Sequence, residues 1–185
     1  MTKEVMTDMS AHMDKTIDAL RKEYQKVRTG RASTSLLDEL RVDYYGTPTP
    51  VGQLATLAVP EPRTITLQPW EAKIIPAIEK AILNANLGLT PSNDGRMIRL
   101  NLPPLTEERR KDIVKQLRKL AEDSKVALRN IRRDTIDELK KLEKDKKITE
   151  DELKRGEKEV QDLTNGHVAR VDEVLAHKEK EVMEV

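Results

Sequence analysis

Apolar residues near the start of the chain recur in steps of three and four, the spacing of one side of an α-helix. They are Met6, Met9, Met13, Ile17, Leu20, Tyr24 and Val27. The pattern predicts an amphipathic helix that begins near Met6. Thr29 and Gly30 should end it, because glycine is favoured where helices terminate.

A second apolar stripe follows Thr106 and continues to Leu142 without a break. Its members are Ile113, Leu117, Leu120, Ser124, Leu128, Ile131, Thr135, Leu139 and Leu142. At about 1.5 Å per residue, this segment predicts a helix roughly 60 Å long, which is too long for a compact globule. Thr106 is placed to cap the helix, and Glu107 and Glu108 suit the positive end of its dipole.

A third helix is predicted to begin at Thr149, since Thr149 and Glu152 have the spacing of a capping box. Residues 144–148 then form a short turn before it. The apolar residues of this helix are Leu153, Val160, Leu163, Val171, Val174 and Val182. Each of the three helices thus has an apolar side to bury.

The second and third helices repeat their apolar residues every eleven positions. The repeats are Leu117, Leu128 and Leu139, then Leu120, Ile131 and Leu142, and finally Val160, Val171 and Val182. Eleven residues in three turns give about 3.67 residues per turn, so these helices should be nearly straight. We expect an elongated antiparallel three-helix bundle in a monomer, with a homo-oligomeric coiled coil as the alternative.

Residues 31–104 are rich in glycine and proline and contain short β-prone runs. Strands are expected at residues 40–45, 53–59, 64–67 and 97–102, and a helix at residues 72–83. The sequence therefore predicts an α+β fold. A small β/α/β domain of residues 31–104 is inserted into a bundle made of residues 1–30 and 105–185.

Both connections between these predicted domains lie at turn-forming residues. Gly30 and Arg31 form the first connection, and Pro103 and Pro104 form the second. Proline cannot continue a helix and restricts the residue before it, so motion there would be confined to few torsions. We expect a hinge at these four residues, with a rigidly docked insert as the alternative.

Composition limits the functional classes. Charged residues make up 36% of the chain and aromatic residues 2%, and cysteine is absent. The absence of cysteine removes disulfides, thiolate nucleophiles and Cys-ligated zinc. No apolar run approaches the roughly 20 residues needed to cross a bilayer, and no secretory signal is evident. We expect a cytoplasmic protein without membrane contact.

Charge is distributed unevenly along the chain, although the net charge is only +1. Residues 106–147 carry 15 Lys and Arg against 10 Asp and Glu, whereas residues 148–185 carry 6 against 11. On a helical wheel, eight cations of the second helix fall within an arc of about 100° beside the apolar stripe. This basic face consists of Lys111, Lys115, Arg118, Lys125, Arg129, Arg132, Arg133 and Lys140.

The basic face suits a polyanion, because arginine and lysine bind phosphates at the spacing that a helix offers. Tyr44, Tyr45 and Trp70 all fall in the inserted domain, so the helices lack aromatic residues on which bases could stack. Folded RNA is therefore expected rather than a single strand. A solvated face, or one paired with acids of the third helix, is the alternative.

Candidate catalytic groups are few. His12, His167 and His177 have no metal-ligand spacing, and His167 falls near the apolar stripe, as a hydrogen-bonded core histidine would. Carboxylates alternate with Lys and Arg, as on exposed helix faces. Residues 89–94 lie between glycines but lack the lysine of a phosphate loop, so an ordinary loop is expected. We predict no enzyme activity, no cofactor and no metal.

Several long motifs are familiar and occur in order along the chain. They are RTGRAS (28–33), YYGTPTPVGQLA (44–55), LGLTPSNDG (87–95), LPPLTEERRKD (102–112), RNIRRD (129–134) and KDKKITEDE (144–152). Together they closely resemble the bacterial ribosome recycling factor family. The resemblance implies a three-helix bundle with a flexibly attached second domain. It also implies binding to the large ribosomal subunit after termination and, with elongation factor G and GTP, splitting of the ribosome for reuse.

Residue by residue, the resemblance carries RNA contacts onto a short set of cations. These are Arg129, Arg132 and Arg133, with Arg109, Arg110 and Lys111 near the start of the same helix. Lys115, Arg118 and Lys125 extend the predicted RNA-binding set along the basic face. The pair Asn165-Gly166 departs from what a regular helix favours, since glycine costs about 1 kcal/mol relative to alanine. A coiled-coil adaptor that contacts only proteins is the rival function.

Overall fold

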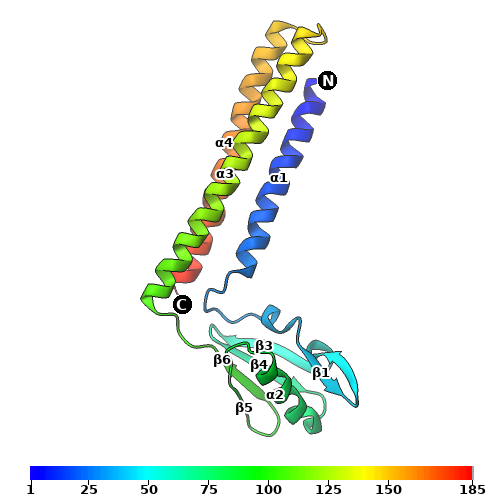
Figure 1. Ribbon diagram of the computed structural model, residues 1–185, viewed down its shortest axis with the longest axis vertical. Coiled ribbons are helices and arrows are strands. Elements are labelled where there is room, and N and C mark those ends of the chain that lie inside the picture. Colours follow the sequence, from blue (N-terminus) through cyan, green and yellow to red (C-terminus); the bar gives the residue numbers. More distant parts are fainter. Residues whose placement is uncertain (185) are drawn as a thin grey trace. The chain divides into compact units, whose positions relative to one another are not determined.

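The computed structural model describes residues 1–184 and is α+β, as predicted (Figure 1). The described chain divides into two compact units. One, the helical unit, combines Met1–Arg28 with Glu108–Glu184, and the other, the sheet unit, comprises Thr29–Glu107. Each unit has its own hydrophobic core.

The helical unit contains α1 (Thr2–Lys26), α3 (Glu107–Lys144) and α4 (Glu150–Met183). Figure 1 shows these helices side by side, with α3 running opposite to α1 and α4. The predicted apolar stripe of α1 is buried from Met6 to Tyr24. The Tyr24 hydroxyl donates to the backbone oxygen of Leu117 at 2.7 Å, which ties α1 to α3.

Two of the predicted eleven-residue repeats lie at the centre of this unit. Leu117, Leu128 and Leu139 of α3 and Val160, Val171 and Val182 of α4 are all 0% exposed. A period of eleven matches a straight helix closely, so the same side of α3 and of α4 faces inward along the whole length. The predicted burial of these two repeats is confirmed, whereas the residues of the third repeat are half-buried, namely Leu120, Ile131 and Leu142.

The ends of the helices partly differ from the prediction. Helix α1 ends at Lys26, and Val27 is already extended with ψ 119°, so the helix does not reach Thr29. The predicted capping box at Thr149 is present. The Oγ1 hydroxyl of Thr149 accepts from the backbone amide of Glu152 at 3.2 Å, and the Glu152 carboxylate accepts from the backbone amide of Thr149 at 2.7 Å.

Helix α4 continues without interruption through Asn165 and Gly166. Their neighbours Thr164 and His167 are only 3% and 6% exposed, so packing on both sides holds this segment helical. His167 is a hydrogen-bonded core residue, as predicted, with Nδ1 2.8 Å from the backbone oxygen of Leu163. His12 and His177 are exposed.

The sheet unit consists of short elements. In chain order they are η1 (Thr34–Leu37), β1 (Arg41–Tyr44), β2 (Thr47–Pro50), η2 (Val51–Gln53), β3 (Ala55–Glu61), β4 (Thr64–Pro69), η3 (Ala72–Ile74), α2 (Ile75–Asn84), β5 (Pro91–Asn93) and β6 (Ile98–Asn101). Strands β1 and β2 form a two-stranded sheet, and the others form a four-stranded sheet in the order β3-β4-β6-β5. All pairs are antiparallel.

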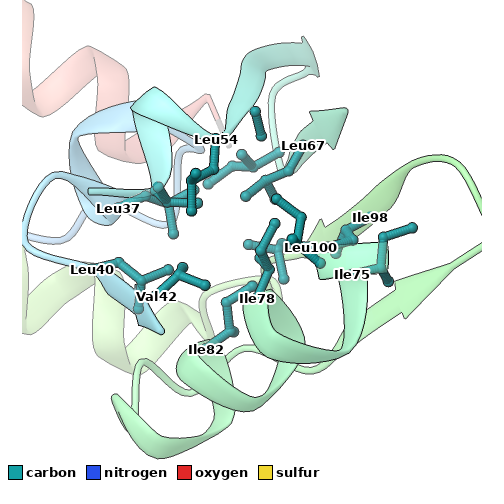
Figure 2. Packing of buried hydrophobic residues seen from close by; sticks show 14 of the residues in the cluster. Leu37, Leu40, Val42, Leu54, Leu67, Ile75, Ile78, Ile82, Ile98 and Leu100 are labelled. Atoms are coloured by element: carbon teal, nitrogen blue, oxygen red, sulfur yellow. The ribbon is translucent and has the colours of Figure 1, made fainter. Parts of the chain in front are cut away.

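The core of the sheet unit lies between α2 and the strands (Figure 2). Ile78 and Ile82 of α2 point toward Val42 of β1 and toward the inner residues of the four-stranded sheet, and Figure 2 shows them converging. Leu67 on β4 and Leu100 on β6 are 0% exposed. The fully buried hydrophobic residues of this unit are all aliphatic, and Tyr44 packs against them partly buried.

Two strands were missed by the sequence prediction, and both are edge strands. Residues 91–93, which were expected to be in a loop, form β5 and pair with β6. Residues 47–50 form β2, where Pro48 and Pro50 lack an amide hydrogen. Proline is tolerated in an edge strand because, at alternate positions, the backbone amide points to solvent and not to the partner strand.

The two connections to the sheet unit are anchored on one hairpin turn. The Ala32 amide donates to the backbone oxygen of Pro62 at 2.7 Å, and the Leu102 amide donates to that of Arg63 at 2.8 Å. Gly30 has φ +75°, and a Cβ there would lie 2.7 Å from Cγ of Leu105. Both the backbone conformation and the contact with Leu105 thus require glycine at this position.

Candidate nucleic-acid interface

The basic face of α3 lies beside the buried stripe of the helical unit. Six of its eight cations are exposed, namely Lys111, Lys115, Arg118, Arg129, Arg133 and Lys140. Lys125 and Arg132 are half-buried. Helix α3 presents these side chains in successive turns because its apolar residues fix its orientation in the bundle.

Two cations at the α4 border of the face are ion-paired. Nε of Arg118 lies 2.7 Å from Oε1 of Glu179, and Nζ of Lys125 lies 2.6 Å from Oδ1 of Asp172. The hydrogen bond to Glu179, reinforced by Coulombic attraction, raises the pKa of Arg118 above its ordinary value. At these two positions the face is paired with acids of the last helix, which is the alternative that the sequence left open.

The RNIRRD segment has different partners. Arg132 donates from Nη1 to Oε1 of Gln161 at 3.3 Å, and Arg133 donates from Nη2 to Oδ1 of Asn130 at 3.3 Å. Both acceptors are neutral amides. Arg129 has an acidic partner on its own helix, with Nη1 3.1 Å from Oε1 of Glu122.

The cations at the start of α3 point in different directions. Arg109 and Lys111 are exposed. Arg110 lies on the inner side of the helix, where Nη1 donates to the backbone oxygen of Met183 at 3.2 Å. Its Nε is buried without a hydrogen-bond partner among residues 1–184. The geometry therefore separates Arg110 from the basic face.

The sequence did not identify Gln161 and Asn165 as part of this surface. Nε2 of Gln161 donates to Oδ1 of Asn165 at 2.8 Å, so the two amides form one chain of hydrogen bonds to Arg132. Gln161 and Asn165 could have been found from the short turn between α3 and α4, because that turn sets the antiparallel register of the two helices. Two neutral amides then stand out in a helix that is otherwise rich in acids.

The arrangement can bind phosphates but offers little for chemistry. Exposed guanidinium groups bind a phosphate through two parallel hydrogen bonds. No group of three or more His, Asp or Glu in the described part of the chain is placed to hold a metal ion. None of the helices within residues 1–184 is long and apolar enough to cross a bilayer.

Comparison with known proteins identifies the family. The family model described as ribosome recycling factor matches residues 20–183. The chain belongs to the ribosome recycling factor family. It is 82% identical to the ribosome-recycling factor of Geotalea uraniireducens and 76% identical to that of Geobacter sulfurreducens, over all 185 residues and the whole of each relative. Proteins of this family are non-enzymatic factors.

Solved structures of ribosome recycling factors have the same fold. A solution structure of a ribosome recycling factor is 39% identical, with a TM-score of 0.72 over 100% of this chain and 98% of that chain. The T. thermophilus ribosome recycling factor, in a structure with E. coli elongation factor G on the E. coli post-termination complex, is 46% identical. Its TM-score is 0.63 over 98% of both chains.

Proposed function

We propose that this chain binds the large ribosomal subunit after translation termination and splits the post-termination complex together with elongation factor G and GTP. Ribosomes, messenger RNA and transfer RNA are thereby reused. The observation that carries the proposal is the full-length similarity to ribosome recycling factors, one of which is described on a post-termination complex with elongation factor G. The protein acts in the cytoplasm as a monomer.

The contact with ribosomal RNA is made by the basic face of α3, centred on Arg129, Arg132 and Arg133. The partners of Arg132 and Arg133 are neutral amides, so no carboxylate in these hydrogen bonds competes with phosphate for the two guanidinium groups. Cations that neutralise phosphates release condensed counterions, and binding then weakens steeply with salt. Lys111, Lys115 and Lys140 extend the face along α3, and Arg109 lies beside it at the helix start.

The hinge at Gly30, Arg31, Pro103 and Pro104 belongs to the same proposal. The domain of residues 31–104 reorients relative to the bundle of residues 1–30 and 105–185 while both stay folded. Support comes from the extended Val27, which ends α1 before the connection, and from the two prolines of the second connection. Such motion lets one domain follow elongation factor G while the other stays on RNA.

Charge reversal at Arg132 tests the RNA contact. Arg132→Glu should lower affinity for purified large subunits at least tenfold, because a charge-assisted contact is worth roughly 1.5 to 3 kcal/mol. The slope of log affinity against log salt should fall by about one. Stability should change by no more than about 0.5 to 1.5 kcal/mol, because Arg132 is half-buried and loses its hydrogen bond to Gln161. Subunit splitting with elongation factor G and GTP should fall in parallel.

Two controls separate charge from folding. Lys22→Glu reverses an exposed charge on α1 and should leave binding unchanged. Leu128→Ala should cost about 2 to 5 kcal/mol of stability through a cavity, while the folded fraction still binds. If Arg132→Glu binds with the affinity and salt slope of the parent, the assignment of the basic face fails. If the parent itself does not bind large subunits at low salt, the adaptor function is favoured instead.

A further inference from the structure

Three positions on α3 match three on α4 in the antiparallel register that two ion pairs set, Arg118 with Glu179 and Lys125 with Asp172. On α3 they are Arg118, Lys125 and Arg132, and on α4 they are Glu179, Asp172 and Asn165. Each series advances by seven residues, and the two run in opposite directions. We call these three matched positions the seam.

The first two seam positions carry opposite charges in contact. Arg118 meets Glu179 at 2.7 Å, and Lys125 meets Asp172 at 2.6 Å. The Lys125 side chain is only 21% exposed, so the pair with Asp172 is shielded from water on one side. A phosphate approaching either cation must compete with a carboxylate that is already bound.

The third seam position breaks the pattern. Residue 165 is a neutral asparagine, and its Oδ1 accepts from Gln161, whose Oε1 in turn accepts from Arg132. Among residues 1–184, Gln161 is the hydrogen-bond partner that the structure gives to Arg132. A guanidinium has five N–H donors, so four remain for another acceptor. Arg132 is thus held in place by a neutral partner and not by a carboxylate.

We propose that Gln161 and Asn165 are positioning residues that determine where along the seam RNA phosphate binds. The amide pair orients Arg132 and leaves its charge available, whereas Asp172 and Glu179 reserve Lys125 and Arg118 for contacts between helices. Of the three seam positions, phosphate therefore binds at Arg132. This inference rests on the proposed function, because it assumes that the face binds ribosomal RNA.

Exchanging amide and carboxylate groups at the seam tests whether the partner on α4 decides which cation binds phosphate. One exchange should weaken binding to large subunits and the other should strengthen it. Gln161→Glu places a carboxylate on Arg132 and should lower affinity for purified large subunits about fivefold. Its salt slope should fall by about one, while its melting temperature stays the same or rises. Asp172→Asn releases Lys125 and should raise affinity about threefold, with a steeper salt slope.

Matched controls make the same atomic change away from the seam. Gln116→Glu adds a carboxylate to an exposed position on the opposite side of α3, and Glu173→Gln removes one beside Asp172. Both should bind within about twofold of the parent, since distant exposed charges are screened. If Gln161→Glu fails to fold, Asn165→Asp adds the same charge one hydrogen bond further away and should weaken binding in the same direction.

The outcomes separate this inference from the function on which it rests. If Arg132→Glu weakens binding but Gln161→Glu and Asp172→Asn behave like their controls, the role of the amides is overturned and the RNA contact stands. If the exchanges change only the melting temperature, the seam is merely structural and the inference is again overturned. If Arg132→Glu itself binds like the parent, both the RNA site and the seam assignment are lost.

Discussion

At the scale of residues, Asp14 joins the first helix of the bundle to the last. Its Oδ1 accepts from Nη1 of Arg170 at 2.6 Å and lies 3.0 Å from Nε2 of His167. These hydrogen bonds, first to Arg170 and then to His167, hold the pKa of Asp14 below its ordinary value of 3.8. A half-exposed carboxylate thereby stabilises a buried histidine that has polar partners on both ring nitrogens.

This pKa shift predicts the acid stability of the helical unit. A carboxyl whose pKa is lower in the folded state than in the unfolded state stabilises the fold at pH values above the unfolded-state pKa. This stabilisation is lost as the pH falls through the folded-state pKa. Asp14→Asn should therefore lower the melting temperature at pH 7 but flatten its decline below about pH 4. Melting by circular dichroism across pH 3 to 7 measures both, with Asp18→Asn as an exposed control. Parallel acid profiles for Asp14→Asn and the parent would contradict the prediction.

Tyr24 predicts a matching effect at alkaline pH. Burial, with a smaller contribution from Glu179, raises the pKa of Tyr24 to about 12. Stability from its protonated hydroxyl is present below the unfolded pKa of about 10 and is lost as pH rises toward 12. Tyr24→Phe should cost about 0.5 to 1.5 kcal/mol at pH 7, because the bond to Leu117 disappears. An absorbance titration in which all tyrosines ionise near pH 10 would rule out this environment.

At the scale of elements, the sequence predicted the helices better than the strands. Apolar residues that recur over several turns fit only a helix with one buried side, so the sequence alone predicts which sides of α1, α3 and α4 are buried. Strands β2 and β5 were missed because their prolines and polar residues are also those of loops. Each becomes a strand only by pairing with the neighbouring strand along the chain, β2 with β1 and β5 with β6.

The site was predictable only in outline, for a similar reason. A helical wheel places the cations of α3 beside the stripe, but it contains no information on α4. The ion pairs of Arg118 and Lys125, the amides at Arg132 and the inward position of Arg110 all depend on a second helix. Those contacts appear once the register between α3 and α4 is known.

The two glycines of α4 provide a test of packing within one element. A Cβ at Gly166 would have no atom within 4 Å, whereas at Gly156 it would lie 3.0 Å from Cδ1 of Leu139 and 3.6 Å from Cε of Met6. Gly166→Ala should stabilise the protein by about 1 kcal/mol through helix propensity. Gly156→Ala should raise the free energy of unfolding by less, because Leu139 must move in a filled core. Equal gains in urea unfolding would show that Gly156 has free space around it.

At the scale of the whole molecule, the two units have separate cores. The sheet unit is held by aliphatic residues around α2, none of which belongs to the basic face. Substitutions in one core should therefore leave the other unit folded. Within the sheet unit, a Cβ at Gly30 would meet Leu105, and both connecting segments bond to the turn at Pro62 and Arg63.

The proposed hinge predicts a change in the distance between the units when the protein binds ribosomes. Because the chain has no cysteine, Glu39→Cys and Ala169→Cys can carry a pair of dyes on exposed positions of the two units. Single-molecule energy transfer should give several distances in the free protein and a narrower set on the large subunit. Replacing Pro103 and Pro104 with glycine should broaden the free distribution, since proline restricts the backbone torsions at and before it. Melting of each variant checks that both units stay folded. One fixed distance, the same in the free protein, on the ribosome and after the glycine replacements, would show that the connection is rigid.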